Sequence, residues 1–180
     1  MSCMKKFAVI CISLFLLAAC KKKVDELPPA TQTGANTFGA KVNGELWVPQ
    51  VFGPLANDIL ETRLFANGDL SIKASNFSLS PTETEFDIFI KGVTATGTYL
   101  LNSNATYPSM LTGYGYYVKR VLTPKDEWIT SSTATGSVTI TRIDPLNKIV
   151  SGTFQFNAAS IYTPSQILMV TDGRFDLKIQ

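Results

Sequence analysis

Short runs of alternating apolar and polar residues, separated by turn residues, constrain the fold of this chain more than any other feature. Residues 38–43 alternate in this way and end in an Asn-Gly pair at 43–44. Such a pair accepts the positive φ angles of a two-residue hairpin turn, so we expect residues 45–48 to return as the partner strand. The same pair recurs at 67–68, where we expect a second hairpin.

Alternation also predicts strands further along the chain. In residues 69–75 and 85–91 the apolar side chains fall at every second position, so that one face of each strand would be buried. Residues 57–63 are ambiguous, because they could also form one or two helical turns. The remaining expected strands cover residues 64–66, 97–101, 114–122, 137–143, 149–158 and 174–179.

These elements favour an all-β fold. Many short strands without a long helical period indicate a single-domain antiparallel β-sandwich over residues 37–180, with a lipocalin-like β-barrel as the alternative. Strands of mixed polarity further predict sheets that face water on one side. Trp47 follows a tight turn closely and is expected in the core.

The N-terminus has the anatomy of an export signal. Two lysines at 5–6 precede an apolar run at 7–17, which is too short for a permanent membrane span, and Leu17-Ala-Ala-Cys20 closes it. This order resembles a bacterial lipoprotein signal. The resemblance implies that residues 1–19 are cleaved and that Cys20 is acylated, which would anchor the chain to a membrane of the cell envelope, on the periplasmic side or at the outer membrane. An ordinary cleaved signal or a buried apolar helix is the alternative.

Residues 20–36 are expected to form a lipidated N-terminus and a flexible linker. The lysines at 21–23 would attract anionic headgroups or simply keep the linker solvated. Residues 24–36 contain little that could be buried. Stretched out, the 16 or so residues after Cys20 would reach about 50 Å, which predicts a domain that moves freely above the membrane.

Composition excludes several classes of function. Histidine is absent, and the three cysteines lie at positions 3, 11 and 20, so the expected domain has neither the commonest metal ligand nor a thiolate. We therefore expect no metal and no cofactor. Without Lys5 and Lys6 the 16 basic residues fall to 14, equal to the 14 acidic ones. This balance argues against a nucleic-acid partner.

Three segments carry a second resemblance. The hairpin of residues 38–44 with Trp47, the segment Val150-Ser-Gly-Thr-Phe-Gln-Phe156, and Thr171-Asp-Gly-Arg-Phe-Asp176 are similar to a family of small β-rich envelope lipoproteins of Bacteroidota. The resemblance implies the same location and a β fold. It carries over no catalytic residue.

Carboxylate pairs are the candidates for acid and base chemistry. Acid pairs could in principle hydrolyse glycosidic bonds, but none has a spacing signature and exposed solubilising charge explains them better. Asp144 and Asn147 could bind calcium, although turn chemistry accounts for them better. The pairs are Glu85 with Asp87, Asp172 with Asp176, and Asp126 with Glu127.

An aromatic cluster is the candidate binding site. Tyr114 and Tyr116 should project from one strand face with only glycine between them, and Tyr117 and Trp128 follow. Such a strip could stack on a sugar or another small ligand, or receive a peptide, whereas core packing is the favoured alternative. We therefore predict a lipid-anchored, non-catalytic binding or structural protein of the envelope. A module that binds a carbohydrate or another small ligand through the aromatic strip is the alternative, and a carboxylate-based hydrolase is less favoured.

Overall fold

The computed structural model describes residues 24–51, 59–78, 82–120 and 126–180, and the regular structure in these ranges is β. No helix among them is long and apolar enough to cross a bilayer. The strands are β1 (Thr37–Val42), β2 (Glu45–Trp47), β3 (Leu60–Leu64), β4 (Leu70–Asn76), β5 (Glu83–Ile90), β6 (Gly97–Leu101), β7 (Tyr114–Arg120), β8 (Glu127–Ile129), β9 (Gly136–Asp144), β10 (Ile149–Ser160) and β11 (Ile167–Lys178).

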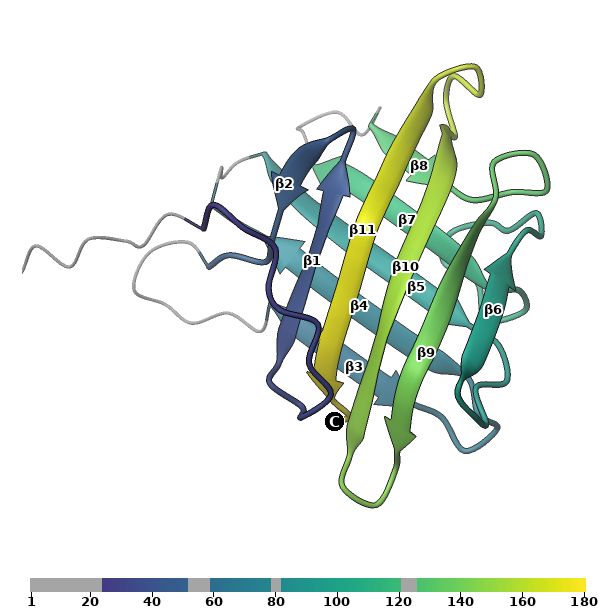
Figure 1. The fold of residues 1–180 in the computed structure, drawn as a ribbon. Coiled ribbons are helices and arrows are strands. Elements are labelled where there is room, and N and C mark those ends of the chain that lie inside the picture. Colours follow the sequence, from purple (N-terminus) through teal and green to yellow (C-terminus); the bar gives the residue numbers. More distant parts are fainter. Residues whose placement is uncertain (1–23, 52–58, 79–81, 121–125) are drawn as a thin grey trace, which may run out of the picture.

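All eleven strands belong to one antiparallel sheet that curls strongly into a half-barrel. The main path runs β2-β1-β11-β10-β8-β7-β5-β4-β3, and β6 and β9 branch from β10. In Figure 1, β1, β11, β10 and β9 cross in front of β3, β4, β5 and β7. The all-β antiparallel prediction is therefore confirmed, and the strands form one curled sheet instead of the two separate sheets of a sandwich.

Strand β10 is the junction that creates the two layers. Its first part pairs with β9, from Ile149 opposite Asp144 to Phe156 opposite Gly136. Its last residues pair with β8 instead, with Ala159 opposite Ile129. One edge of a long twisted strand thus serves two neighbours in succession, which lets the sheet turn back over itself.

Aromatic rings fill the space between the layers. Phe38 from β1 lies 5.1 Å from Phe154 of β10 and 5.6 Å from Phe86 of β5, measured between ring centroids. Trp47 packs edge-on against Phe86 at 4.6 Å, and its indole N–H donates to the Thr84 hydroxyl at 2.8 Å. Trp47 is buried, as predicted for the core.

The two expected hairpins form with different turns. Asn43 and Gly44 have φ angles of 50° and 86°, which confirms a two-residue turn with both central residues left-handed. In the second hairpin Gly68 has a φ of 85°, and the backbone N–H of Phe65 donates to the Asp69 carbonyl across a longer loop.

Several expected boundaries are wrong. The segment that was ambiguous from sequence forms strand β3 over residues 60–64, and the strand expected at 64–66 lies mostly in the loop that follows it. Positions 57 and 58 lie outside the described residues. Strand β11 begins at Ile167, well before the expected Arg174, and the three-residue β8 was not expected.

Strands β5 and β7 are covered on both faces. Every residue from Phe86 to Ile90 and from Tyr114 to Val118 is buried. This corrects the expectation that each sheet would face water on one side. The cause is the segment 102–113, which contributes side chains that pack on the outer face of these strands.

The N-terminal segment that the structure describes is attached to the sheet. Residues 24–36 run across β1 in Figure 1, and backbone N–H groups of Thr33, Gly34 and Ala35 donate to the carboxylate of Asp176 in β11. Over these residues the prediction of a flexible linker is wrong. The predicted signal peptide and the predicted acylation site Cys20 lie outside the described residues.

Candidate ligand-binding site

The candidate site lies on the outer face of the layer formed by β3, β4, β5 and β7. Here Phe89, Tyr114, Tyr116, Val118 and Ile129 form a buried apolar cluster, and Phe65, Ala105 and Tyr107 pack against it. The ring of Tyr107 stacks on that of Tyr116 with centroids 3.7 Å apart and planes 2° from parallel. The loop between β6 and β7 thus places an aromatic ring above the sheet.

This covering loop changes the predicted aromatic strip. Tyr114 and Tyr116 do share one face of β7, but they are only 3% and 2% exposed. Tyr117 lies on the opposite face, in the core, with its ring 6.0 Å from that of Trp128. The four residues therefore do not form one open surface, and Tyr107 takes the outer position that was expected for Tyr116.

A polar pocket of about 320 Å³ opens beside Tyr107. It has an aromatic wall, an aliphatic wall, a hydroxyl group and charges of both signs. Its size lies at the lower end of the range for small-molecule sites. We call it the Tyr107 pocket, and its lining residues are Ile59, Glu61, Lys73, Ser75, Glu85, Tyr107 and Arg120.

Strand register brings the charges together. Glu61 of β3 lies opposite Lys73 of β4, and Lys73 lies opposite Asp87 of β5. Across the β5–β7 pair, one guanidinium nitrogen of Arg120 donates to both carboxylate oxygens of Glu85 at 3.2 Å. Burial acts to lower the pKa of Arg120, but the charge and hydrogen bond of Glu85, together with the nearby Tyr107 and Tyr116, raise that pKa above its ordinary value. Arg120 therefore stays cationic.

Asp87 lies behind this pocket and is 3% exposed. Burial raises the pKa of Asp87 from its ordinary value of 3.8 to about 6, although Lys73 and the hydroxyls of Tyr107 and Tyr114 act in the opposite direction. The Lys73 ammonium is 3.8 Å from Oδ2. Among the described residues no donor forms a well-aligned hydrogen bond with Oδ1. The carboxyl group is therefore poorly solvated and incompletely paired.

Burial and the nearby Asp87 carboxylate also raise the pKa of Tyr107, to about 12. The phenol therefore remains a neutral hydrogen-bond donor at physiological pH.

The sequence indicated part of this site. Glu85 and Asp87 were predicted to share a strand face, and they do. Lys73, Tyr107 and Arg120 were not singled out. Lys73 could have been found by pairing β4 with β5, because that register places it opposite Asp87. No local sequence feature indicates that Tyr107 folds back over β7.

Three other carboxylates from the predicted pairs, Asp172, Asp176 and Glu127, have different structural partners. Asp172 is exposed and pairs with Lys41 at 2.8 Å, while Asp176 is buried among hydrogen-bond donors. Glu127 accepts hydrogen bonds from the hydroxyls of Tyr116 at 2.6 Å and Tyr162 at 2.9 Å. Each of these carboxylates thus has a structural partner of its own.

Asp144 has the turn role that was favoured for it. It accepts hydrogen bonds from the backbone and the side chain of Asn147, at 3.0 and 2.7 Å, and pairs with Arg142 at 2.8 Å. Within the described residues, no three acidic, cysteine or histidine side chains lie together as a group that could hold a metal ion.

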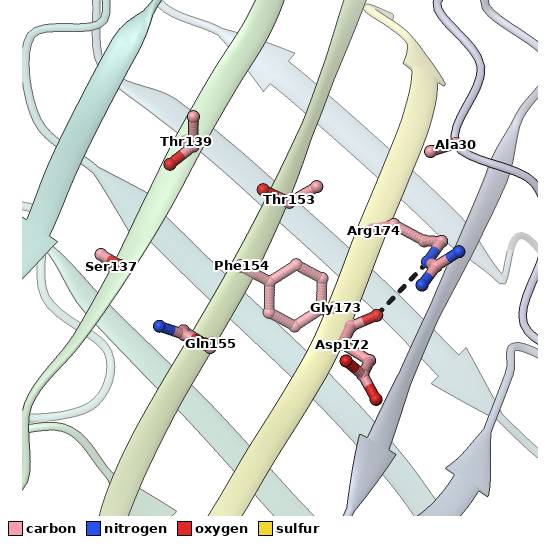
Figure 2. Close-up of a pocket in the computed structure, with 9 residues that line it drawn as sticks. All are labelled: Ala30, Ser137, Thr139, Thr153, Phe154, Gln155, Asp172, Gly173 and Arg174. Atoms are coloured by element: carbon pink, nitrogen blue, oxygen red, sulfur yellow. Dashed lines mark hydrogen bonds between the residues drawn. The ribbon is translucent and has the colours of Figure 1, made fainter.

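A second hollow of about 410 Å³ lies over β9, β10 and β11. Figure 2 shows hydroxyl and amide side chains from β9 and β10 on one side of it and Arg174, which donates to the Asp172 carbonyl, on the other. Its side chains Thr153, Gln155 and Asp172 are exposed to solvent. The side chains that line the Tyr107 pocket are half-buried, apart from Arg120, and they carry charges of both signs, so we take the Tyr107 pocket as the candidate site.

Comparison with known proteins adds one finding. Residues 35–176 match a family model described as a domain of unknown function, DUF6252. The matched range contains every residue that lines the Tyr107 pocket. No curated protein and no solved structure matches the chain.

Proposed function

The chain belongs to the DUF6252 family of domains of unknown function, and we propose that it is a lipid-anchored protein of the cell envelope whose domain binds a small polar ligand. The N-terminal sequence supports the anchor, since a charged start, an apolar run at 7–17 and Ala-Ala-Cys20 follow one another. The Tyr107 pocket supports the binding role. It is the observation that carries the proposal.

The lining of the pocket indicates the chemistry of the ligand. Glu85 and Glu61 can accept hydrogen bonds from hydroxyl groups, Arg120 and Lys73 can donate, and the Tyr107 ring offers an apolar face. Two anions and two cations balance, so a net charge on the ligand is not required. A neutral, hydroxyl-rich ligand of monosaccharide size fits this combination, and a single sugar residue at the end of a glycan is the form we expect.

We propose binding without catalysis because of where the carboxyl groups lie. The raised pKa of Asp87 would suit a general acid. However, Asp87 is not among the residues that line the pocket, and it is buried beside Tyr107 and Tyr114. Glu85, which does line the pocket, is engaged by Arg120. Glu61, the other carboxylate that lines the pocket, pairs with Arg63 at 2.7 Å. None of these three carboxyl groups is therefore free to act catalytically on a bound ligand.

A pair of arginine substitutions tests the site. Glycans recognised by the purified domain on an array would be measured again by calorimetry with Arg120→Gln and Arg174→Gln. We expect Arg120→Gln to weaken binding about tenfold or more, because a charge-assisted hydrogen bond is lost. Arg174→Gln, in the second hollow, should leave affinity unchanged.

The affinities of the two variants distinguish binding in the Tyr107 pocket from binding in the second hollow. Equal affinity in the Arg120 variant and the parent, or loss of binding in the Arg174 variant alone, would contradict the assignment to the Tyr107 pocket. An array without any bound glycan would contradict the ligand class.

A further inference from the structure

The N-terminal segment is fixed to the sheet close to the predicted acylation site. The carboxylate of Asp176 accepts hydrogen bonds from the Thr31 hydroxyl at 2.6 Å and from the backbone N–H groups of Thr33 and Gly34 at 2.9 and 2.8 Å. Ser151 of β10 donates to the same carboxylate at 2.7 Å. Residues 31–35 are therefore held by a buried group of the domain.

The contacts continue toward the N-terminus. Leu27 and Pro28 lie directly over Gly39 of β1, where a Cβ atom would come within 2.7 Å of Pro28 Cδ. Val24 lines one hollow with Pro49 and Leu60. It lines a second one with residues at the ends of β2 and β4. The segment thus lies along the domain as far back as Val24.

This attachment limits the distance between domain and acyl chains. Cys20 and Val24 are four residues apart, and four residues span at most about 14 Å in any conformation. The flexible linker expected from sequence would have reached about 50 Å when stretched. If Cys20 is acylated, as the proposed function holds, the Val24 end of the domain stays within about 14 Å of the acylated cysteine.

We propose that the face around Val24 and residues 48–51 lies against the bilayer that holds the acyl chains. Val24 and Val51 are exposed apolar residues on this face, at 44% and 39%. The adjoining hollow is lined mainly by apolar groups, including Pro28, Pro49 and Ile59. A lipid surface is the one partner that the short remaining chain necessarily brings to this face, and apolar side chains gain free energy in the interfacial region.

The geometry also places the opposite side of the domain away from the membrane. In Figure 1, β6 lies at the far side of the molecule from β2 and from the purple N-terminal segment. Leu100 of β6 is 64% exposed and would therefore face the aqueous phase.

Two cysteine variants of the full-length protein test the orientation. All native cysteines lie at or before Cys20, so Val51→Cys and Leu100→Cys each add a single thiol for a fluorophore. The acylated protein would be reconstituted in phosphatidylethanolamine–phosphatidylglycerol vesicles that contain a lipid with a nitroxide headgroup. We expect several-fold stronger quenching of the label at position 51 than at position 100.

A matched control lengthens the chain between Cys20 and the domain without altering the domain. Insertion of about twelve Gly and Ser residues between Lys23 and Val24 adds about 20 Å of flexible chain. This insertion should bring quenching at position 51 down toward the value at position 100. Equal quenching at the two positions in the parent, with acylation confirmed by mass spectrometry, would overturn the orientation alone. Absence of acylation would instead contradict the proposed function.

Discussion

Asp87 shows how strand register creates an unusual environment for a single residue. Its neighbours on the outer face are Lys73, Glu85, Tyr107 and Tyr114. Of these, Lys73 is cationic and lies 3.8 Å away, which is too long for a good hydrogen bond. The ionised carboxylate is therefore less stable in the folded chain than in water, and its pKa is raised to about 6.

The first prediction follows from this raised pKa. Because the folded pKa exceeds the unfolded value, ionisation of Asp87 destabilises the folded state. The destabilisation is absent below about pH 4, grows between about pH 4 and 6, and is complete above about pH 6. At about 1.4 kcal/mol per pKa unit, the cost approaches about 3 kcal/mol. Asp87→Asn, which cannot ionise, should therefore be more stable than the parent at pH 8 by up to that amount.

Chemical denaturation across a pH series measures this effect. The difference between Asp87→Asn and the parent should shrink as the pH falls from 6 to 4. A difference that is the same at pH 4 and pH 8 would show that desolvation of the charge is not its cause.

At the scale of elements, the N-terminal segment behaves as part of the sheet because of one carboxylate. Burial alone would raise the pKa of Asp176, but hydrogen bonds from Thr31, Ser151 and the backbone of Thr33 and Gly34 hold it far below its usual range. Such a group stabilises the folded state above the unfolded pKa, near 4, and loses this effect as the pH falls toward the folded pKa.

We therefore expect Asp176→Asn to lower the free energy of unfolding by about 2 to 3 kcal/mol at pH 7. The loss should diminish below pH 4, because there the unfolded parent takes up a proton at Asp176 that the folded parent does not. Asp172→Asn is the matched control, because Asp172 pairs with Lys41 on the surface and exposed pairs contribute at most about 1 kcal/mol. Equal destabilisation by both substitutions in urea titrations would contradict the role given to Asp176.

The same element shows what local sequence cannot indicate. Residues 24–36 have the composition of a linker, but Thr31 and Thr33 donate hydrogen bonds to Asp176, which lies more than a hundred positions away. Tyr107 is a similar case, since its stacking on Tyr116 depends on a loop path that no periodicity encodes.

The alternation of apolar and polar residues predicted most strands, but it missed the segments in which this alternation is interrupted. The first half of β11 was missed because Ile167 and Met169 are apolar yet exposed, and because Asp172, with a φ of 54°, lies where the register between β10 and β11 shifts. Strand β8 was missed because three residues are too few to show a period. In contrast, Phe86, Ile88 and Ile90 alternate without interruption, and the inner face of β5 was predicted correctly.

The whole molecule combines a curled sheet, a polar pocket on its outer face and an N-terminal segment fixed along β1. The residues after β11 contact the edge strand β3, since the backbone N–H of Gln180 donates to the Thr62 carbonyl at 2.9 Å. The Tyr107 pocket and the N-terminal segment are thus parts of one framework. A ligand bound in the pocket would be held at a fixed distance from the membrane if the chain is acylated at Cys20.

Mass spectrometry of the N-terminus of protein extracted from membranes tests the central claim of a lipid-anchored domain most directly. We predict a mature chain that begins at Cys20 and carries diacylglyceryl and acyl groups, and that is lost from the membrane fraction in Cys20→Ala. An uncleaved or unacylated N-terminus on protein recovered from the cytosol would contradict the account.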